Sequence, residues 1–554
     1  MLAGEENLGV RGKCQLASNA LFCGPREPGA RDLARTLRIP QLSPQEEAMK
    51  ALSCTAMLVL LLMAAIGCGG GSTATPIITP PPPTGFTLAD LSGEYVATFA
   101  GSEGTGETYL VLRFTADGKG TITAGTLDYN REEIYEGMQS TALTGTYTVA
   151  TDGRTALTIR TSSPSLNAST GPFVFSTTLR SDGNMVLMPF QFPLRGSGSV
   201  WKVDGTFPGT LSGTYTFLFS GGVSVMGFLD GAGRMSFDSA GNVTGVWDLN
   251  LAGGPSANVP FTGTYTVGAD GRGTATLVST GPSPWYAAPT QLSLQAVSSN
   301  TLVLLSQDKA LAVAGTAEKQ SGTVSTSTFV GAYVLSSTGT AYYPGSGYYL
   351  GGTAATGRIV SNGNGSVTSG TLDQNKAYSV TSDPSVSGFY NIDAAGRGTA
   401  TLNTAKGPVN VAFYPVSPKR AFFVTLDSRS MAHGTLDLQS GTGYSSAALK
   451  GDYAMVVSAV DFLDDDTCAA GHLSADGAGG LKGTLDVMTA GATYSGLAVT
   501  GTYAVTADGR GTATISNANK GGAMKIVFYL LSTREARVLG ADGAPLLSGN
   551  VSQQ

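Results

Sequence analysis

A fourfold internal repeat constrains this chain of 554 residues more than any other feature of its sequence. Self-similarity at a fixed period means that each repeat forms one structural unit. The tripeptide Gly-x-Tyr recurs about every 120 residues, and each copy is followed by a second Gly-x-Tyr; the eight tyrosines are Tyr95, Tyr147, Tyr215, Tyr265, Tyr333, Tyr390, Tyr453 and Tyr503. The sequence therefore predicts four related modules, at 86-205, 206-322, 323-442 and 443-554.

Apolar and polar residues alternate within each module. Residues 263–267 read Gly-Thr-Tyr-Thr-Val, which is the period of a β-strand with one buried face and one solvated face. The Asp270-Gly271 pair follows, and this pair is typical of a type I′ hairpin turn, which needs a positive φ at both central residues. Equivalent pairs recur at Asp117-Gly118, Asp152-Gly153, Asp476-Gly477 and Asp508-Gly509. The modules are therefore expected to consist of β-hairpins.

The second module illustrates the expected fold, which is all-β. Its strands are predicted near 211-219, 225-229, 233-238, 242-249, 261-268, 273-279, 291-297, 301-306 and 311-319. A meander of this length favours an antiparallel, eight-stranded up-and-down barrel, because closure removes the exposed sheet edges. The opening Gly-x-Tyr and the meander resemble the calycin barrels of lipocalins and avidins. The alternative is an eight-bladed β-propeller in which each half-module supplies one blade.

An export signal precedes the modules. Met49 and Lys50 are followed by the apolar stretch 55–66 and then by Gly67 and Cys68. This stretch is too short for a transmembrane helix, which needs about 20 apolar residues. The segment 49-68 resembles a bacterial lipoprotein signal, although that family usually has Leu where Ala65 stands. The resemblance implies that Cys68 is lipidated and that the membrane is a partner through this anchor.

The segments on either side of the signal are consistent with an exported, membrane-anchored protein. Residues 1-48 are a polar extension, and we expect translation to begin at Met49. Residues 69-85 are rich in Gly, Thr and Pro, which favours a semi-rigid stalk in polyproline II conformation. The predicted location is the cell envelope, at the outer membrane or the cell surface. If translation begins at Met49, the mature chain keeps only the lipidated Cys68 and Cys468. Cys468 then has no partner for an intramolecular disulfide and is expected to be buried or inert.

Composition excludes several classes of function. Lys plus Arg number 33 against 39 for Asp plus Glu, so no basic surface is available to hold nucleic acid. The two histidines, His433 and His472, lie in different modules and are expected to be incidental. No nucleophile elbow or phosphate-binding loop is found, and the sequence predicts no cofactor. We therefore expect a protein that is not an enzyme.

One aspartate recurs at an equivalent place in every module. It ends the sequences Gly-Thr-Leu-Asp or Gly-Val-Trp-Asp, and in three modules an Asn follows two residues later; the residues are Asp128, Asp248, Asp373 and Asp486, with Asn130, Asn250 and Asn375. One interpretation is a polar or cation site used four times. The other is an Asx turn at a strand end, which satisfies its own backbone. Internal recurrence favours the turn.

Two acidic clusters are weaker candidates. Asp461, Asp464, Asp465 and Asp466 could bind calcium, but the spacing and central Gly of an EF-hand are missing, so a solvated loop is favoured. Glu132, Glu133 and Glu136 could include the acid pair of a glycosidase, which is defined by a distance that sequence does not give.

A tyrosine cluster is the most suggestive binding feature. Tyr342, Tyr343, Tyr348 and Tyr349 flank a Pro-Gly-Ser-Gly turn, and their rings could contact a glycan or a surface protein. The sequence thus predicts a lipid-anchored envelope protein with a binding, adhesion or structural role. The alternative is a hydrolase that acts on envelope or extracellular polysaccharide through loop carboxylates.

Overall fold

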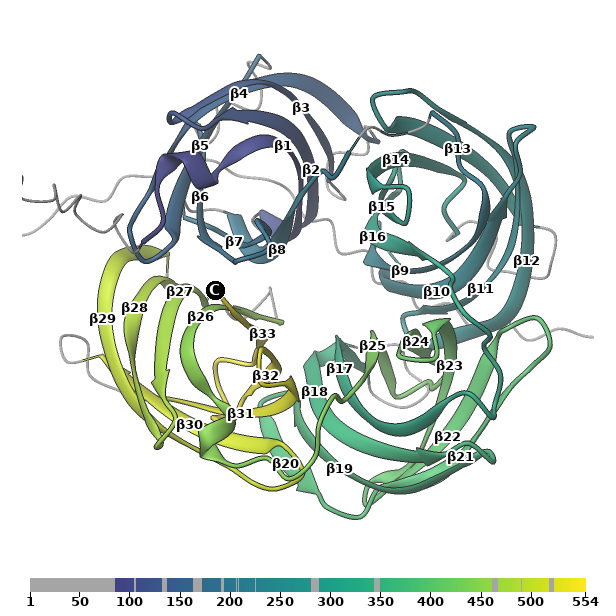
Figure 1. Cartoon of the computed structure of the whole chain (residues 1–554). Helices are drawn as coiled ribbons and strands as arrows, with labels where there is room; N and C mark the ends of the chain where they lie inside the picture. The colour runs from purple at the N-terminus through teal and green to yellow at the C-terminus, as the bar shows by residue number, and fades with distance from the viewer. Residues whose placement is uncertain are drawn as a thin grey trace, which may run out of the picture. The chain divides into compact units, whose positions relative to one another are not determined.

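Four antiparallel β-barrels in tandem make up the part of the chain that the structure describes, as Figure 1 shows with labelled strands. The computed structural model describes residues 85–554, except for 104–105, 132–136, 163–171, 191–193, 206, 208, 225, 280–287, 343–348, 461–466, 490 and 518–522. The four barrels belong to one compact unit, Pro81–Gln554. The predicted fold class is confirmed: the described chain is all-β, and its modules are closed eight-stranded meanders, with one strand of barrel 3 divided in two, rather than pairs of propeller blades.

Barrels 1 and 2 each close through a pairing between their first and last strands. Barrel 1 consists of β1 (Ser92–Glu103), β2 (Gly106–Asp117), β3 (Thr121–Arg131), β4 (Gln139–Val149), β5 (Arg154–Thr161), β6 (Phe173–Leu179), β7 (Met185–Pro189) and β8 (Leu194–Lys202). Barrel 2 consists of β9 (Gly213–Val223), β10 (Gly227–Phe237), β11 (Asn242–Leu251), β12 (Gly254–Val267), β13 (Arg272–Ser279), β14 (Gln291–Ser298), β15 (Thr301–Ser306) and β16 (Leu311–Lys319).

Barrel 3 differs in one detail, because two short strands, β20 and β21, both pair with β19 and together replace one long strand. It consists of β17 (Val330–Tyr342), β18 (Tyr349–Asn362), β19 (Ser366–Lys376), β20 (Ser379–Asp383), β21 (Ser387–Ile392), β22 (Gly398–Thr404), β23 (Gly407–Ser417), β24 (Arg420–Thr425) and β25 (Ser430–Leu438). Barrel 4 consists of β26 (Lys450–Ala459), β27 (Cys468–Asp476), β28 (Gly480–Thr489), β29 (Ala492–Val505), β30 (Arg510–Asn517), β31 (Ala523–Ser532), β32 (Glu535–Gly540) and β33 (Leu547–Gln553).

Helices play almost no part in the described residues. Two short 3-10 helices, η1 (Leu88–Asp90) and η3 (Ser446–Ala448), precede barrels 1 and 4. In the part of the chain that the structure describes, no helix has the length and hydropathy of a membrane span.

Strand β10 corrects one expected boundary in barrel 2. The sequence predicts separate strands at 225-229 and 233-238, but residues 227–237 form one continuous strand. The glycines that break the alternation, Gly231 and Gly233, lie beneath the rings of Phe219 and Phe217 on β9; a Cβ at these glycines would come within 2.3 and 2.4 Å of a ring carbon. Glycine is therefore needed here to admit two large rings, and it does not end the strand.

The hairpin turns differ from the type I′ turns that we expected. In the Asp152-Gly153 turn, the Gly153 amide donates to Ala150 O at 2.9 Å and the Ala150 amide donates to Arg154 O at 2.7 Å. Only the glycine has a positive φ, of 83°. This geometry is a three-residue loop with a type I turn and a glycine bulge. The prediction of hairpins is correct, and the predicted turn type is wrong.

Large side chains fill the barrel interiors. In barrel 2, Trp247 stacks on Phe261 with ring centroids 4.3 Å apart, and Phe217 packs edge-on against Trp247. The interior spaces found in barrels 3 and 4 measure about 40 Å³ each, close to the ~30 Å³ that one water molecule occupies in the liquid. These two spaces are too small for an organic ligand.

The repeated Gly-x-Tyr motifs build the barrels. The hydroxyl of each second tyrosine donates to the carbonyl of the residue that lies just before the first strand of its barrel; the pairs are Tyr147–Leu91, Tyr265–Leu211, Tyr390–Phe329 and Tyr503–Leu449, at 2.6 to 2.8 Å. A buried hydroxyl needs such a partner. This hydrogen bond thus holds the segment that precedes the first strand against the end of the barrel.

Many strands are buried on both faces, which the period-two pattern did not predict. Strand β7 is buried at all five positions, whereas β29 alternates as expected. The outward side chains of the doubly buried strands form four apolar clusters between barrels. Representative members are Val111 with Val303 between barrels 1 and 2, Ala232 with Val424 between 2 and 3, Val334 with Leu539 between 3 and 4, and Met188 with Met488 between 4 and 1. The interfaces therefore form a closed cycle.

Candidate functional site between the barrels

The recurring aspartates join neighbouring barrels. Each is buried and pairs with an arginine that follows the turn glycine of another barrel; the pairs are Asp128–Arg272, Asp248–Arg397, Asp373–Arg510 and Asp486–Arg154. The prediction of a strand-end Asx turn is therefore wrong, because the arginines that pair with these aspartates lie on the next barrel. An interface that repeats head to tail returns to its start only when the rotation closes, and here the fourth pair joins barrel 4 to barrel 1.

The pair between barrels 2 and 3 shows the geometry. Asp248 is fully buried, and Arg397 donates to both of its carboxylate oxygens, at 2.8 Å from Nε and 2.7 Å from Nη2. The hydroxyl of Tyr414 and the backbone amide of Asn258 also donate to it. Burial raises the pKa of Tyr414, and the charge of Asp248 raises it further. A buried bidentate pair of this kind gives geometric specificity.

The pair between barrels 3 and 4 has the same form. Arg510 donates to Asp373 through Nε at 2.7 Å and Nη2 at 2.8 Å, and Tyr529 donates to it at 2.6 Å. Burial raises the pKa of Asp373, but the hydrogen bonds from Arg510 and Tyr529 lower it by more, so its pKa lies below the usual value. Asp373 therefore remains ionised in the folded protein at neutral pH.

The asparagines that follow the aspartates act in the same interfaces. The side-chain amide of Asn250 donates to the carbonyls of Thr425 and Asp427 in barrel 3, at 2.9 and 3.0 Å. Asn130 donates in the same way to the carbonyl of Ser306 at the end of β15 in barrel 2, and Asn375 to that of Asp542 in barrel 4. In the fourth interface Met488 stands at the equivalent position and packs in an apolar cluster with barrel 1.

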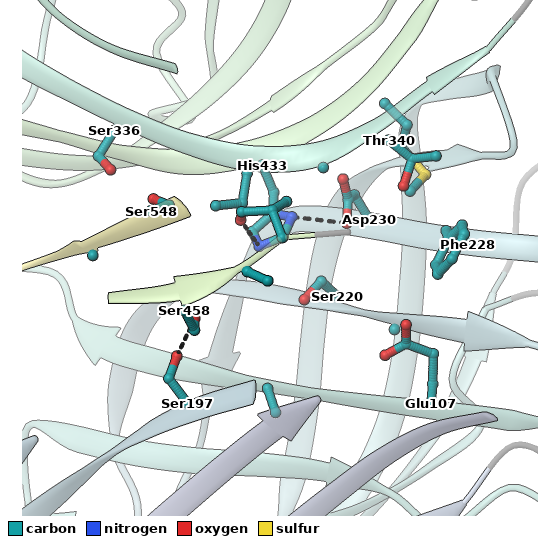
Figure 2. A pocket seen from close by; sticks show the side chains of 18 of the residues that line it. Glu107, Ser197, Ser220, Phe228, Asp230, Ser336, Thr340, His433, Ser458 and Ser548 are labelled. Carbon is teal, nitrogen blue, oxygen red and sulfur yellow. Dashed lines mark hydrogen bonds and ion pairs between the residues drawn. The ribbon is translucent and has the colours of Figure 1, made fainter. Parts of the chain in front are cut away.

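A cavity of about 290 Å³ lies where the four barrels meet, and every barrel contributes residues to its wall. We call it the interbarrel cavity; Figure 2 shows it from close by. Hydroxyl side chains line much of the wall, among them Ser197 from barrel 1, Ser220 from barrel 2, Ser336 from barrel 3, and Ser458 and Ser548 from barrel 4. Its position between modules explains why no single module predicts it.

One of four equivalent positions around the cavity carries an imidazole–carboxylate pair. In each barrel, one equivalent position of the first strand pairs with a residue on the last strand. From barrel 1 to barrel 4, these last-strand residues are Ser197, Ala314, His433 and Ser548. On the second strand, the corresponding residues are Tyr109, Asp230, Ala354 and Cys468. Asp230 of barrel 2 meets His433 of barrel 3, with Nδ1 and Oδ1 2.8 Å apart. The sequence pattern did not single out Asp230, and the expectation that His433 is incidental is not met, since it stands where two other modules have Ser and contacts a buried carboxylate.

The carboxylate of Asp230 raises the pKa of its His433 partner. Burial lowers the pKa of His433, but the charge and the hydrogen bond of Asp230 raise it by more, so the pKa of His433 lies above its usual value. On the other side of the ring, Nε2 lies 3.5 Å from the hydroxyl of Thr338. Asp230 is 1% exposed, and its Oδ2 has no hydrogen-bond partner among the described residues. A buried acceptor without a donor typically costs about 1–3 kcal/mol, and more when it is charged.

The other polar groups of the wall differ in how fully they are paired. Ser197 and Ser458 are within hydrogen-bond distance of each other across barrels 1 and 4, at 2.8 Å. Glu107 accepts a hydrogen bond from Tyr109 at 2.8 Å. Three half-buried serines also place their hydroxyls at the cavity; they are Ser220, Ser336 and Ser548. Hydroxyls of this kind can donate to a ligand and accept from it.

Part of the predicted tyrosine site lies at an interface. Tyr342 is 4% exposed, and its hydroxyl is near Gly227 of barrel 2. Burial raises the pKa of Tyr342, and the charge of Asp230 raises it further. Tyr349 lines the interbarrel cavity and contacts the ring of Phe228, with centroids 6.0 Å apart. Tyr343 and Tyr348 lie outside the described residues. The two described rings therefore do not form an outward-facing pair.

Some of the remaining predicted site residues are described by the structure, and the others lie outside the described residues. Cys468 is buried, and its thiol donates to Gly196 O at 3.2 Å. His472 lies 2.6 Å from a side-chain oxygen of Gln554, measured from Nδ1. Several candidates lie outside the described residues, namely Cys68, Glu132, Glu133, Glu136, Asp461, Asp464, Asp465 and Asp466. In the described ranges, no three His, Cys, Asp or Glu side chains are grouped so that they could hold a metal ion.

Comparison with known proteins gives distant likenesses only. No protein-family model matches the chain, and no curated protein matches its sequence. Among solved structures, it is similar to a double mutant of transferrin-binding protein B from Haemophilus parasuis, with a TM-score of 0.18 and 8% identity over 88% of this chain and 97% of that one. The same protein from Neisseria meningitidis gives a TM-score of 0.17 and 11% identity over 69% and 83%. A putative AttH from Nitrosomonas europaea gives 0.14 and 9% over 66% and 98%. Likenesses this low assign no function.

Proposed function

We propose that this protein is a lipid-anchored protein of the cell envelope that binds a small polar ligand in the interbarrel cavity without transforming it. The observation that supports this most is the asymmetry of the cavity wall. Three of four equivalent positions carry Ser or Ala, and the fourth carries His433, paired with Asp230. A polar pair that serves only the fold would be expected at every interface, as the recurring aspartates are.

The filled interiors support the same site. In barrels 3 and 4, the inner spaces of about 40 Å³ leave no room for the kind of ligand that calycin barrels enclose. The interbarrel cavity, at about 290 Å³, is near the lower end of the roughly 300–1,000 Å³ typical of ligand pockets.

A cavity-filling variant tests this function. Ser220 is half-buried on the cavity wall, and Ser220→Phe would place a ring in the space. Native mass spectrometry of the protein extracted from its own membranes should show a small-molecule adduct on the wild type and none on Ser220→Phe. The exposed Asp204 offers a control, since Asp204→Asn should retain the adduct. An adduct of the same mass on Ser220→Phe, or none on the wild type, would contradict the proposal.

A second candidate function is hydrolysis, favoured by one contact geometry. Thr338, His433 and Asp230 are in contact in the order hydroxyl, imidazole and carboxylate, at 3.5 and 2.8 Å. This order is that of a nucleophile, its general base and an orienting acid, and such contacts are often loose without substrate. Turnover of p-nitrophenyl acetate that is lost in both Thr338→Val and His433→Gln would favour this candidate over pure binding.

A further inference from the structure

The interbarrel cavity has a wall whose chemistry narrows the ligand class. We propose that its ligand is a neutral ring polyol, the size of a single sugar ring, which donates a hydroxyl hydrogen bond to Asp230. This inference rests on the proposed function and adds the identity of the ligand class to it.

The charge of the wall disfavours ionic ligands. No Lys or Arg is among the described residues that line the cavity, so an anion would find no cation to pair with apart from His433. That imidazole already faces the carboxylate of Asp230 at 2.8 Å. A cationic ligand would have to share the carboxylate of Asp230 with His433, whose Nδ1 already contacts Oδ1. Glu107, the other carboxylate of the wall, already accepts the hydroxyl of Tyr109.

The hydrogen-bonding groups of the wall call for a ligand with several hydroxyls. Asp230 offers an acceptor, Oδ2, that has no donor among the described residues. Ser220, Ser336 and Ser548, all half-buried, offer hydroxyls on the same wall. In Figure 2 these groups come from barrels 2, 3 and 4 and surround one space. A ring polyol carries donors and acceptors around its whole edge, so it can engage several barrels at once, whereas an apolar ligand would leave Oδ2 unpaired.

Aromatic rings complete the wall on one side. Phe228 of barrel 2 and Tyr349 of barrel 3 both line the cavity, with ring centroids 6.0 Å apart. The flat, apolar C–H face of a sugar ring packs against such rings, while its hydroxyls point to polar groups. The combination of a free carboxylate oxygen, hydroxyls and rings is therefore complementary to a neutral sugar.

The test compares ligands of one ring size and different charge. Isothermal titration of the full-length protein in detergent would use glucose, galactose, mannose and myo-inositol as neutral probes, with gluconate as the anion and glucosamine as the cation. We expect at least one neutral probe to bind at least tenfold more tightly than both charged probes. Asp230→Asn should weaken that binding at least tenfold, and Asp204→Asn, an exposed control, should leave it unchanged.

The outcomes separate the two proposals. If gluconate or glucosamine binds as tightly as the best neutral probe, the ligand class is refuted, while binding in the cavity stands. If no probe binds and the extracted protein carries no adduct, both proposals fail. Should Asp230→Asn fail to fold, Ser220→Ala provides a milder variant, since it removes one hydroxyl and no charge. Unchanged binding of the neutral probe in Ser220→Ala and in a folded Asp230→Asn would overturn the proposed contacts.

Discussion

The interbarrel pair Asp248–Arg397 gives the sharpest prediction about stability. Replacing Asp248 by Ala leaves Arg397, whose side chain is 14% exposed, without its carboxylate at the interface. Breaking a buried ion pair by removing one partner typically costs about 3–5 kcal/mol, because the remaining charge stays buried without compensation. Asp248 also accepts hydrogen bonds from Tyr414 and the Asn258 amide, which lose their acceptor. We therefore expect Asp248→Ala to lower the free energy of unfolding by about 4 kcal/mol.

Urea unfolding followed by tryptophan fluorescence measures this loss. Trp247 precedes Asp248 on β11 and is buried in the core of barrel 2, so its emission reports on that barrel. Replacing Trp201 and Trp285 by Phe would leave this single reporter. With an m value of about 2 kcal/mol per M, a loss of about 4 kcal/mol moves the midpoint by about 2 M urea.

A double-mutant cycle provides the refutation. If the cost arises from the stranded charge, Asp248→Ala combined with Arg397→Ala should cost less than the sum of the two single changes. The exposed pair Lys525–Asp542, at 3.5 Å and with Lys525 62% exposed, is the matched control. Lys525→Ala should cost less than about 1 kcal/mol. Additive losses in the cycle, or a loss below about 1 kcal/mol for Asp248→Ala, would show that the pair does not hold barrels 2 and 3 together.

Four further predictions follow from single residues. Metabolic labelling with a palmitate analogue should mark the wild type and miss Cys68→Ser; equal labelling would contradict the anchor. The folded pKa of Asp373 lies below its usual value of about 3.9. Its contribution to stability is therefore present above that usual value and is lost as the pH falls through the folded pKa. The melting temperature of Asp373→Asn should fall less steeply in acid than that of the wild type. Gly315→Ala should cost about 1–3 kcal/mol in urea unfolding, since its Cβ would lie 2.0 Å from the Leu218 carbonyl at the barrel seam. Tyr342→Ala should cost about 3–5 kcal/mol because its ring is buried, whereas a change below 0.5 kcal/mol would show it to be exposed.

The tyrosine cluster shows which structural properties of a residue a local sequence pattern predicts and which it does not. The sequence placed four tyrosines around a turn and left open whether another module covers their rings. The structure answers for Tyr342, which barrel 2 covers, because alternation along a strand fixes the face of a ring but not the neighbour beyond it. The proposal that Tyr343 and Tyr348 contact a glycan or a surface protein remains a prediction, to be checked by glycan-array retention of their alanine variants.

Sequence alone determined the repeat, the strands and the barrels, because each depends on interactions within about 120 residues that recur in four copies. Gly-x-Tyr, the Asp-Gly turns and the period of two are local, so a single pass along the chain finds them. Tertiary structure alone decided which barrels touch. Arg154 and Asp486 are 332 residues apart, and the two strand faces of β7 are both buried only because barrel 4 lies against barrel 1. A signal was present, since an aspartate and a turn arginine recur in every module. Their pairing depends on the rotation between barrels, which no local pattern encodes, and the same rotation brings Asp230 to His433 around the cavity.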